Sequence, residues 1–277
     1  MMRILALMSL PRPRAGALLA ALLVITTTAA ASQVQADAST EETPVEAART
    51  EHRPHVVRWY EVAATVGGVA LLSALDEPLQ RAVQQHRTEN TDDVAQVFRQ
   101  EGEPWYYVGV SLGIVGVGLV TGDDGIRRAG YRVTASLGTS AVVGQVLKVV
   151  IGRSRPNAGR GAFDFHPFTS PVDSNGVSSG KALPSGHAAA AFAIATSLAD
   201  DIHSPVVDVL LYTAATGTAW SRINDDRHWL SDTALGAVLG ISSAKLVSGR
   251  WRIFNLRPPG FLLDPSGGPA VGMSIDF

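Results

Sequence analysis

Six apolar segments dominate the sequence and constrain its fold more than any other feature. They are rich in Ala, Gly, Val and Leu, and each is roughly 12 to 20 residues long, which is the usual length of a helix. The segments are 60–75, 106–121, 133–152, 188–199, 206–220 and 232–247. The pattern predicts an all-α fold, a bundle of about six helices.

The apolar character of these segments suits either a membrane or a buried core. Only 17% of the residues are charged, against about 25% in an average soluble domain. A membrane span needs about 20 predominantly apolar residues, and several segments are shorter or carry a charge, such as Glu61 and Asp208. Segment 106–121 is the best candidate, because Trp105 adjoins two tyrosines as in an interfacial aromatic belt. We favour a membrane protein and keep a soluble bundle as the alternative.

The N-terminal region has the pattern of an export signal. Arg3, Arg12 and Arg14 precede the apolar run 15–25, and small Thr and Ala residues follow. This order is typical of a secretory signal peptide, predicted over 1–36, with an uncleaved anchor helix as the alternative. Either form predicts export. Residues 37–56 are polar and form a predicted linker.

The remaining chain divides into a helical domain, 57–248, and a C-terminal extension, 249–277. In the extension, apolar residues alternate with polar or small ones from Val271 to Phe277, after a turn sequence at 265–268. A period of two predicts a strand, and therefore a small hairpin. The chain has no cysteine, and its 23 basic residues nearly balance 25 acidic ones. Disulfides, Cys-ligated metals and nucleic-acid binding are therefore not expected.

The first chemical cluster is Lys148 with Arg155 and Pro156. Seven residues are close to two helical turns, so the two cations are expected on one face of a helix. Pro156 disfavours helix at the residue before it and turns the chain. Two cations at a helix end can hold an anion, although a structural Lys and a capping Arg would give the same pattern.

The second cluster is Pro-Ser-Gly-His at 184–187, directly before four alanines. Ser185 suits the N-cap of the helix that follows, whose first N–H groups have no partner within the helix. Such a helix end binds phosphate, and Gly186 lets the backbone approach an anion closely. His187 is placed to exchange a proton near neutral pH. An ordinary cap followed by a surface histidine is the alternative.

The third cluster is Ser-Arg at 221–222, followed by His228 and Asp232. Side chains four residues apart stack on a helix. A carboxylate bonded to one imidazole nitrogen fixes the tautomer and leaves the other nitrogen free to attack. The spacing therefore suits a nucleophilic histidine, although taken alone the motif favours a structural His–Asp pair on a helix surface.

The three clusters in this order resemble the motifs of the type 2 phosphatidic acid phosphatase family, which shares its fold with vanadium-dependent haloperoxidases. The resemblance extends from Lys148 to Asp232 without departure at any motif position. It implies a helical bundle with the active site at one end. It also implies a phosphatase that needs no metal or other cofactor and forms a phosphohistidine intermediate.

The resemblance assigns a role to each motif residue. His228 would attack phosphorus, Asp232 would orient it, and His187 would protonate the leaving oxygen and then activate water. The phosphate oxygens would be held by Lys148, Arg155, Ser185, Gly186 and Arg222.

Together with the apolar segments and the export signal, the resemblance implies a lipid phosphate or prenyl diphosphate substrate at the extracytoplasmic, periplasmic face of a membrane. The long connection 157–183 carries Phe163, Phe165 and Phe168, which suit either the rim of an apolar pocket or a locally packed cluster. The alternatives are a soluble exported acid phosphatase of broad specificity, a vanadate-dependent haloperoxidase, and a catalytically silent binder of anionic lipids.

Overall fold

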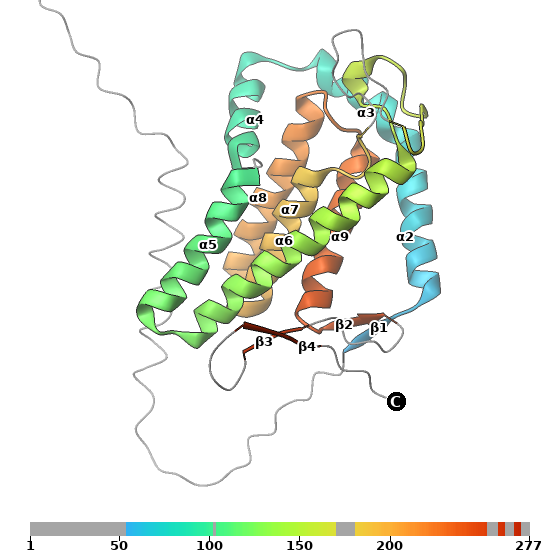
Figure 1. Ribbon diagram of the computed structural model, residues 1–277. Helices are drawn as coiled ribbons and strands as arrows, with labels where there is room; N and C mark the ends of the chain where they lie inside the picture. The colour runs from blue at the N-terminus through green and yellow to red at the C-terminus, as the bar shows by residue number, and fades with distance from the viewer. Residues whose placement is uncertain (1–53, 102–103, 170–180, 254–259, 264–268, 273–277) are drawn as a thin grey trace, which may run out of the picture. The chain divides into compact units, whose positions relative to one another are not determined.

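The computed structural model describes residues 54–101, 104–169, 181–253, 260–263 and 269–272. The predicted signal peptide and nearly all of the predicted linker lie outside these ranges. The expected all-α bundle is confirmed (Figure 1). Its helices are α2 (Trp59–Leu72), α3 (Asp76–Gln85), α4 (Glu89–Glu101), α5 (Pro104–Thr121), α6 (Asp124–Ile151), α7 (Gly186–Ile202), α8 (Pro205–Asn224) and α9 (Leu230–Val247).

Local sequence determines where the helices that carry the chemical clusters begin and end. The Asp123 carboxylate caps α6 by accepting the N–H groups of Gly125 at 2.7 Å and Ile126 at 3.0 Å. Gly152, with φ of 62°, ends α6, and its N–H donates to the carbonyl of Lys148. A left-handed residue of this kind is the common way to stop a helix. The predicted shared helical face of Lys148 and Arg155 is therefore wrong, because the helix stops between them.

Small residues let α7 and α9 pack closely. A Cβ on Gly240 of α9 would lie 2.2 Å from the carbonyl oxygen of Ala189 in α7, and one on Gly236 would lie 2.5 Å from that of Ser185. Only glycine permits such an approach of two backbones. The contact brings the first turn of α7 against the N-terminal half of α9.

The polar segment 76–101, which lies between the first two apolar segments of the sequence, is also helical. It forms two helices, α3 and α4, and α4 packs along α8. The Phe98 ring lies where a Cβ on Gly217 would come within 2.4 Å, so the glycine in α8 makes room for the aromatic side chain of α4. An amphipathic helix buries its apolar face against a neighbour, and α8 provides that neighbour.

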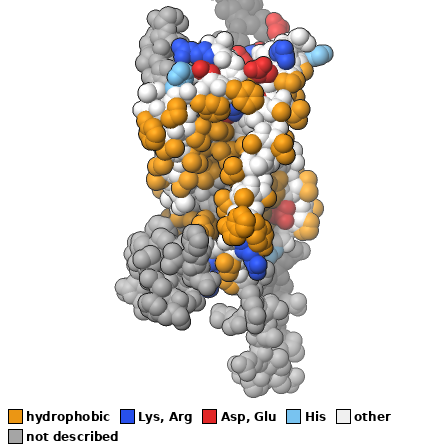
Figure 2. Space-filling view, turned by 90° about the vertical axis from the view of Figure 1, so that its right-hand side faces the viewer, with side chains coloured by type: hydrophobic (Ala, Val, Ile, Leu, Met, Phe, Trp, Pro, Cys, Tyr) orange, Lys and Arg blue, Asp and Glu red, His pale blue; other side chains and the backbone are white. Residues whose placement is uncertain are grey.

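The distribution of apolar side chains is that of a bundle in an apolar solvent. Buried positions of α6, α7 and α9 are mostly Gly, Ala, Ser and Thr, whereas large side chains such as Leu71, Leu112 and Val142 are exposed. Figure 2 shows hydrophobic side chains covering the side of the bundle, with charged side chains towards its upper and lower ends.

Several helices suit a membrane by length and composition. Three stretches are long and apolar enough to cross one, namely Trp59–Gln85, Asp124–Ile151 and Leu230–Val247. The segment 106–121, which the sequence favoured as the best candidate, belongs to the apolar stretch Trp105–Thr121, which falls just short of the 18 residues of the shortest of these three.

Short strands complete the described structure. β1 (His55–Val57) pairs in parallel with β2 (Trp251–Ile253), which the sequence did not predict. β3 (Gly260–Leu263) pairs antiparallel with β4 (Pro269–Gly272), so the expected C-terminal hairpin is present, at a position partly before the predicted strand. The turn at 265–268 and residues 273–277 lie outside the described residues.

Candidate active site

The three clusters meet at the end of the bundle where α6 and α8 finish and α7 and α9 begin (Figure 1). The N–H of Ser185 donates to the carbonyl of Asp232 at 2.9 Å. A Cβ on Gly186 would lie 3.4 Å from Nζ of Lys148. The N–H of Asn157 donates to the carbonyl of Asp226 at 3.2 Å, which holds the segment after Arg155 against the α8–α9 connection. Segments that are far apart along the chain therefore build one site.

The first turn of α7 presents its backbone to this site. Ser185 is the N-cap, and its hydroxyl accepts the N–H of Ala188 at a long 3.4 Å. The N–H groups at the start of a helix have no acceptor within the helix and carry its positive dipole end. The Tyr107 hydroxyl of α5 donates to the carbonyl of His187 at 3.2 Å. This bond ties the turn that carries His187 to a second helix.

Three cations surround the same point. Lys148, Arg155 and Arg222 all lie close enough to His187 to lower its pKa. Nε of Arg155 and Nε of Arg222 are buried and have no hydrogen-bond partner, and the same is true of His187 Nε2 and His228 Nδ1. Buried donors without acceptors are costly, and like charges repel. An anion with several oxygens would satisfy both the unpaired N–H groups and the excess positive charge.

Asp232 is fixed beside His228 by the start of α9. Nδ1 of His228 lies 3.6 Å from Oδ2 of Asp232, an ion-pair distance that is too long for a hydrogen bond. The N–H of Trp229 donates to the same Oδ2 at 2.8 Å. His228 precedes the helix and Asp232 is its third residue, so the expected stacking on one helix is wrong although the two side chains do meet. Contact at Nδ1 leaves Nε2 as the nitrogen available for attack.

Both histidines are held in the neutral form. Burial, and then the positive charges of Arg222, Lys148 and Arg155, lower the pKa of His187 to about 3. Burial also lowers the pKa of His228 to about 4, although the Asp232 carboxylate opposes that shift. A neutral imidazole keeps the lone pair that a nucleophile needs.

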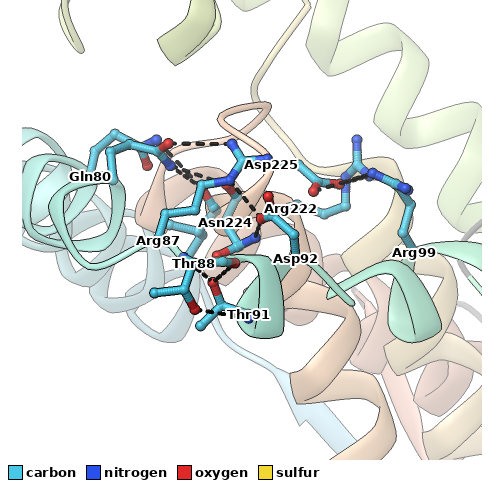
Figure 3. A network of polar contacts seen from close by, with 11 residues as sticks. Gln80, Arg87, Thr88, Thr91, Asp92, Arg99, Arg222, Asn224 and Asp225 are labelled. Carbon is cyan, nitrogen blue, oxygen red and sulfur yellow. Dashed lines mark hydrogen bonds and ion pairs between the residues drawn. The ribbon is translucent and has the colours of Figure 1, made fainter. Parts of the chain in front are cut away.

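Arg222 is held from the side by a second ion pair. Its Nη1 lies 3.2 Å from Oδ2 of Asp225, and the same carboxylate lies 3.4 Å from Nη1 of Arg99 in α4 (Figure 3). Asn224 donates to Asp92 of α4 at 2.8 Å. These contacts hold the end of α8 against α4, which positions the Arg222 guanidinium while its Nε remains unpaired.

Two charged residues that the sequence analysis did not single out lie directly behind Asp232. Arg153 donates to Oδ1 of Asp232 at 2.8 Å and to Oδ2 of Asp76 at 2.6 Å. The available signal for Arg153 was its place inside the first motif, immediately after the glycine that ends α6. Asp76 begins α3, and the sequence offered nothing that linked it to a site so distant along the chain.

The connection after α6 is anchored on one side and exposed on the other. The Phe165 ring lies over the Arg153 guanidinium at 5.6 Å, whereas Phe163 and Phe168 are 65% and 74% exposed. The alternative prediction, a locally packed aromatic cluster, is therefore wrong for Phe163 and Phe168. Within the described ranges, no group of three or more His, Cys, Asp and Glu side chains could hold a metal ion.

Comparisons with known proteins agree with the motifs. The sequence profile of the PAP2 superfamily matches residues 129–254. Lipid A 1-phosphatase of Porphyromonas gingivalis is 34% identical over 129 residues, which cover 46% of this chain and 27% of that protein. The chain thus spans about a quarter of the length of this curated relative.

Two solved structures resemble the fold. A transmembrane PAP2-type phosphatidylglycerolphosphate phosphatase from Bacillus subtilis superposes with a TM-score of 0.52 at 22% identity, covering 69% of this chain and 95% of that one. LpxE of Aquifex aeolicus gives a TM-score of 0.48 at 20% identity, covering 61% and 92%. The profile match includes every motif position from Lys148 to Asp232, so residues 129–254 of this chain resemble the PAP2 superfamily in sequence.

Proposed function

We propose that the protein is a phosphatase that removes phosphate from lipid phosphates or prenyl diphosphates at a membrane surface, through a phosphohistidine on His228. The main supporting observation is that a buried, neutral His228 beside the Asp232 carboxylate lies among three cations, two of which have buried N–H groups that lack acceptors. Phosphoryl transfer requires positioning and neutralisation of negative charge. The site supplies both from its side chains and from the backbone at the start of α7.

The proposed reaction has two displacements at phosphorus. Nε2 of His228 forms a bond to phosphorus as the bond from phosphorus to the leaving oxygen breaks, and His187 gives that oxygen a proton. In the second step His187 takes a proton from water, whose oxygen attacks phosphorus and breaks the P–N bond. Phosphate leaves, and both imidazoles return to their initial forms. Asp232 stabilises the positive charge on His228 during both steps.

His187 acts as an acid only when the substrate is bound. Part of its low pKa comes from the surrounding cations. A phosphate dianion among these cations reverses the local field, and this raises the pKa of the imidazole. Binding of the substrate therefore prepares the proton that the leaving oxygen receives.

The apolar exterior supports a lipid substrate. The three stretches long enough to span a membrane include α6 and α9, which carry Lys148 and Asp232 at the site end. Phe163 and Phe168 are exposed on the connection that also carries Arg155, and aromatic rings favour the interface of a bilayer. The Porphyromonas gingivalis relative is named as a lipid A phosphatase. The phosphate of a lipid would thus reach the site while its chain stays in the bilayer.

Phosphate release from a substrate panel tests the proposed function. The full chain, purified in detergent, is incubated with phosphatidate, a lipid A and undecaprenyl diphosphate, with EDTA present throughout. We expect release from at least one of them, and none from His228→Ala. Absence of release from all three would overturn the proposal, and a requirement for a divalent ion would overturn the metal-independent mechanism.

The intermediate and the side of the membrane need separate measurements. Rapid quenching with 32P-labelled substrate should trap an acid-labile label on the protein that His228→Ala lacks. Because the chain has no cysteine, Asn157→Cys at the site end and Thr121→Cys at the opposite end can each be labelled alone. In intact cells, a maleimide that cannot cross the inner membrane should label Asn157→Cys. Labelling of Thr121→Cys alone would place the site in the cytoplasm.

A further inference from the structure

A buried group of charges lies behind the His228–Asp232 pair. It consists of Asp76, Arg153 and Asp232, whose exposed fractions are 1%, 1% and 0%. Arg153 follows the end of α6, Asp76 begins α3 and Asp232 lies in the first turn of α9. Three elements thus each contribute one charge to a position without access to water.

Every oxygen of the two carboxylates in this group is occupied. Oδ1 of Asp232 accepts from Arg153 at 2.8 Å, and its Oδ2 accepts from the N–H of Trp229 at 2.8 Å. Oδ2 of Asp76 accepts from Arg153 at 2.6 Å, and its Oδ1 accepts the N–H of Ser231 at 2.8 Å. The carboxylate of Asp232 therefore has a fixed orientation when it faces His228.

Arginine suits the position between the carboxylates because its planar fork points in several directions at once. Nη1 reaches Asp232 and the Ser231 hydroxyl, and Nε donates to the carbonyl of Ala162 at 2.8 Å. The rings of Phe165 and Trp229 each lie 5.6 Å from its Cζ. A lysine could supply the charge but not this set of directions.

The positive charge of Arg153 weakens the negative charge that Asp232 presents to His228, and Asp76 compensates for this effect. A cation at 2.8 Å offsets the negative charge that Asp232 offers to His228, and burial makes this effect large because water does not screen it. Asp76, at 2.6 Å from Arg153, offsets the cation in turn. One cation between two anions leaves one negative charge in excess beside His228.

We propose that Arg153 and Asp76 are positioning residues of the reaction: Arg153 fixes the Asp232 carboxylate, and Asp76 offsets Arg153 so that Asp232 keeps its full charge toward His228. This inference rests on the proposed function for its catalytic meaning. In the part of the chain that the structure describes, the other charged or titratable groups that face His228 are Arg155 from the segment after α6, Arg222 from α8 and His187 from α7. All of these are cationic or neutral, so among the described residues the excess negative charge comes from the Asp76–Arg153–Asp232 group.

Neutralising one or two members of this group tests the charge offset. Asp76→Asn removes the offset while keeping the size of the side chain, and Asp76→Asn with Arg153→Gln removes both charges and restores the excess on Asp232. Breaking a buried ion pair on one side is more costly than replacing both partners. Thermal unfolding of each variant therefore accompanies the measurements, and rates are expressed per folded molecule.

The decisive readout is the titration of the His228 imidazole by 15N NMR, which needs no turnover. We expect Asp76→Asn to lower the titration midpoint of His228 by about one pH unit, because less negative charge then stabilises the positively charged imidazole. One pKa unit is a tenfold change in the protonation equilibrium, and the same loss of stabilisation during the reaction should lower kcat about tenfold. The double variant should return the midpoint to that of the wild type. A purely structural role would reduce the folded fraction without moving the midpoint.

A matched control comes from the other end of the bundle. Asp200 also pairs with a cation, Lys245 at 2.6 Å, and Asp200→Asn should change neither the midpoint nor kcat. An unchanged midpoint in Asp76→Asn, or a double variant that titrates like Asp76→Asn, would overturn the inference. If the wild-type protein released no phosphate from any substrate, the proposed function would fail, while the titration would still decide whether Asp76 offsets Arg153.

Discussion

Oδ2 of Asp232 lies 3.6 Å from Nδ1 of His228 and is fixed by the N–H of Trp229 at 2.8 Å. The carboxylate is thus oriented by the backbone at the start of α9 and by Arg153 rather than by the histidine itself. A contact of this length allows the pair to tighten when positive charge develops on His228, because a charged hydrogen bond is shorter and stronger. The resting geometry therefore suits a nucleophile whose charge rises during the reaction.

The first prediction concerns this nucleophile. His228→Ala should abolish phosphate release, whereas Asp232→Asn should retain a small residual rate because the imidazole remains but loses its stabilising charge. Phosphate release by the purified variants is the measurement, with the thermal unfolding midpoint of His228→Ala as the control for folding. An active His228→Ala protein would mean that the nucleophile is another residue.

The sequence was sufficient to name most of the residues that the structure brings together at the proposed site. Lys148, Arg155, Ser185 and His228 could be found because motif spacing is recorded along the chain, and the structure brings all of them to one end of the bundle. The positions of the apolar helices could be predicted from composition, because apolar segments are also a local feature of the sequence. The relative positions of these residues could not be predicted as well. Gly152, in the αL conformation, ends the helix between Lys148 and Arg155, whereas the spacing predicted one helix through both residues.

Contacts between distant, isolated residues could not be predicted from one sequence. Asp76 and Arg153 are single charges with no local period, and only the folded bundle brings them to 2.6 Å. The β1–β2 pair joins two very short strands from opposite ends of the domain. Such short strands lack the alternation that identifies a strand in sequence. Tertiary packing, rather than local preference, creates these features.

The second prediction concerns the proton donor. His187→Ala should slow hydrolysis of alkyl phosphates far more than hydrolysis of aryl phosphates with acidic leaving groups, because a good leaving group needs little protonation. Values of kcat for a series of phosphate esters are plotted against the pKa of the leaving alcohol. The variant should show a steeper dependence than the wild type. Parallel lines would contradict the role of His187 as the acid.

The third prediction concerns proton uptake on anion binding. Near pH 6 the free protein holds His187 neutral, since its pKa is about 3, and a bound dianion raises that pKa toward the ordinary value. Sulfate, which stays dianionic at this pH, should therefore bind with uptake of protons by the protein. Calorimetry in buffers of different ionisation enthalpy measures the uptake. His187→Ala is the control, and a wild-type binding enthalpy independent of the buffer would contradict the shift.

The fourth prediction concerns stability at acid pH. The pKa values of His187 and His228 are lowered to about 3 and about 4, below the value of about 6.5 in an unfolded chain. As the pH falls from about 6.5 to about 4, these two imidazoles therefore bind protons in the unfolded chain but remain neutral in the folded protein. The free energy of unfolding should fall across this window, by at most about 1.4 kcal/mol per pH unit for each imidazole.

Unfolding midpoints measured at intervals between neutral pH and about pH 4 give the slope of this fall. His187→Ala should make the slope shallower, because it removes one of the two imidazoles that bind a proton only in the unfolded chain. Stability that stayed constant over this window in the wild-type protein would show that the histidines are not held neutral.

The last prediction concerns the packing that aligns the site. In Gly240→Ala, the new methyl group would lie 2.2 Å from the carbonyl oxygen of Ala189 and 2.8 Å from the nitrogen of Ala193. Neither backbone atom can move without separating α7 from α9, and overpacking of this kind costs about 1–3 kcal/mol. Because these two helices carry His187 and Asp232, we expect lower kcat as well as a lower unfolding midpoint. Gly138→Ala in α6 meets no atom within 4 Å and should leave activity unchanged, with stability equal or slightly higher. A Gly240→Ala protein as active and stable as Gly138→Ala would mean that the close approach of α7 and α9 does not set the site geometry.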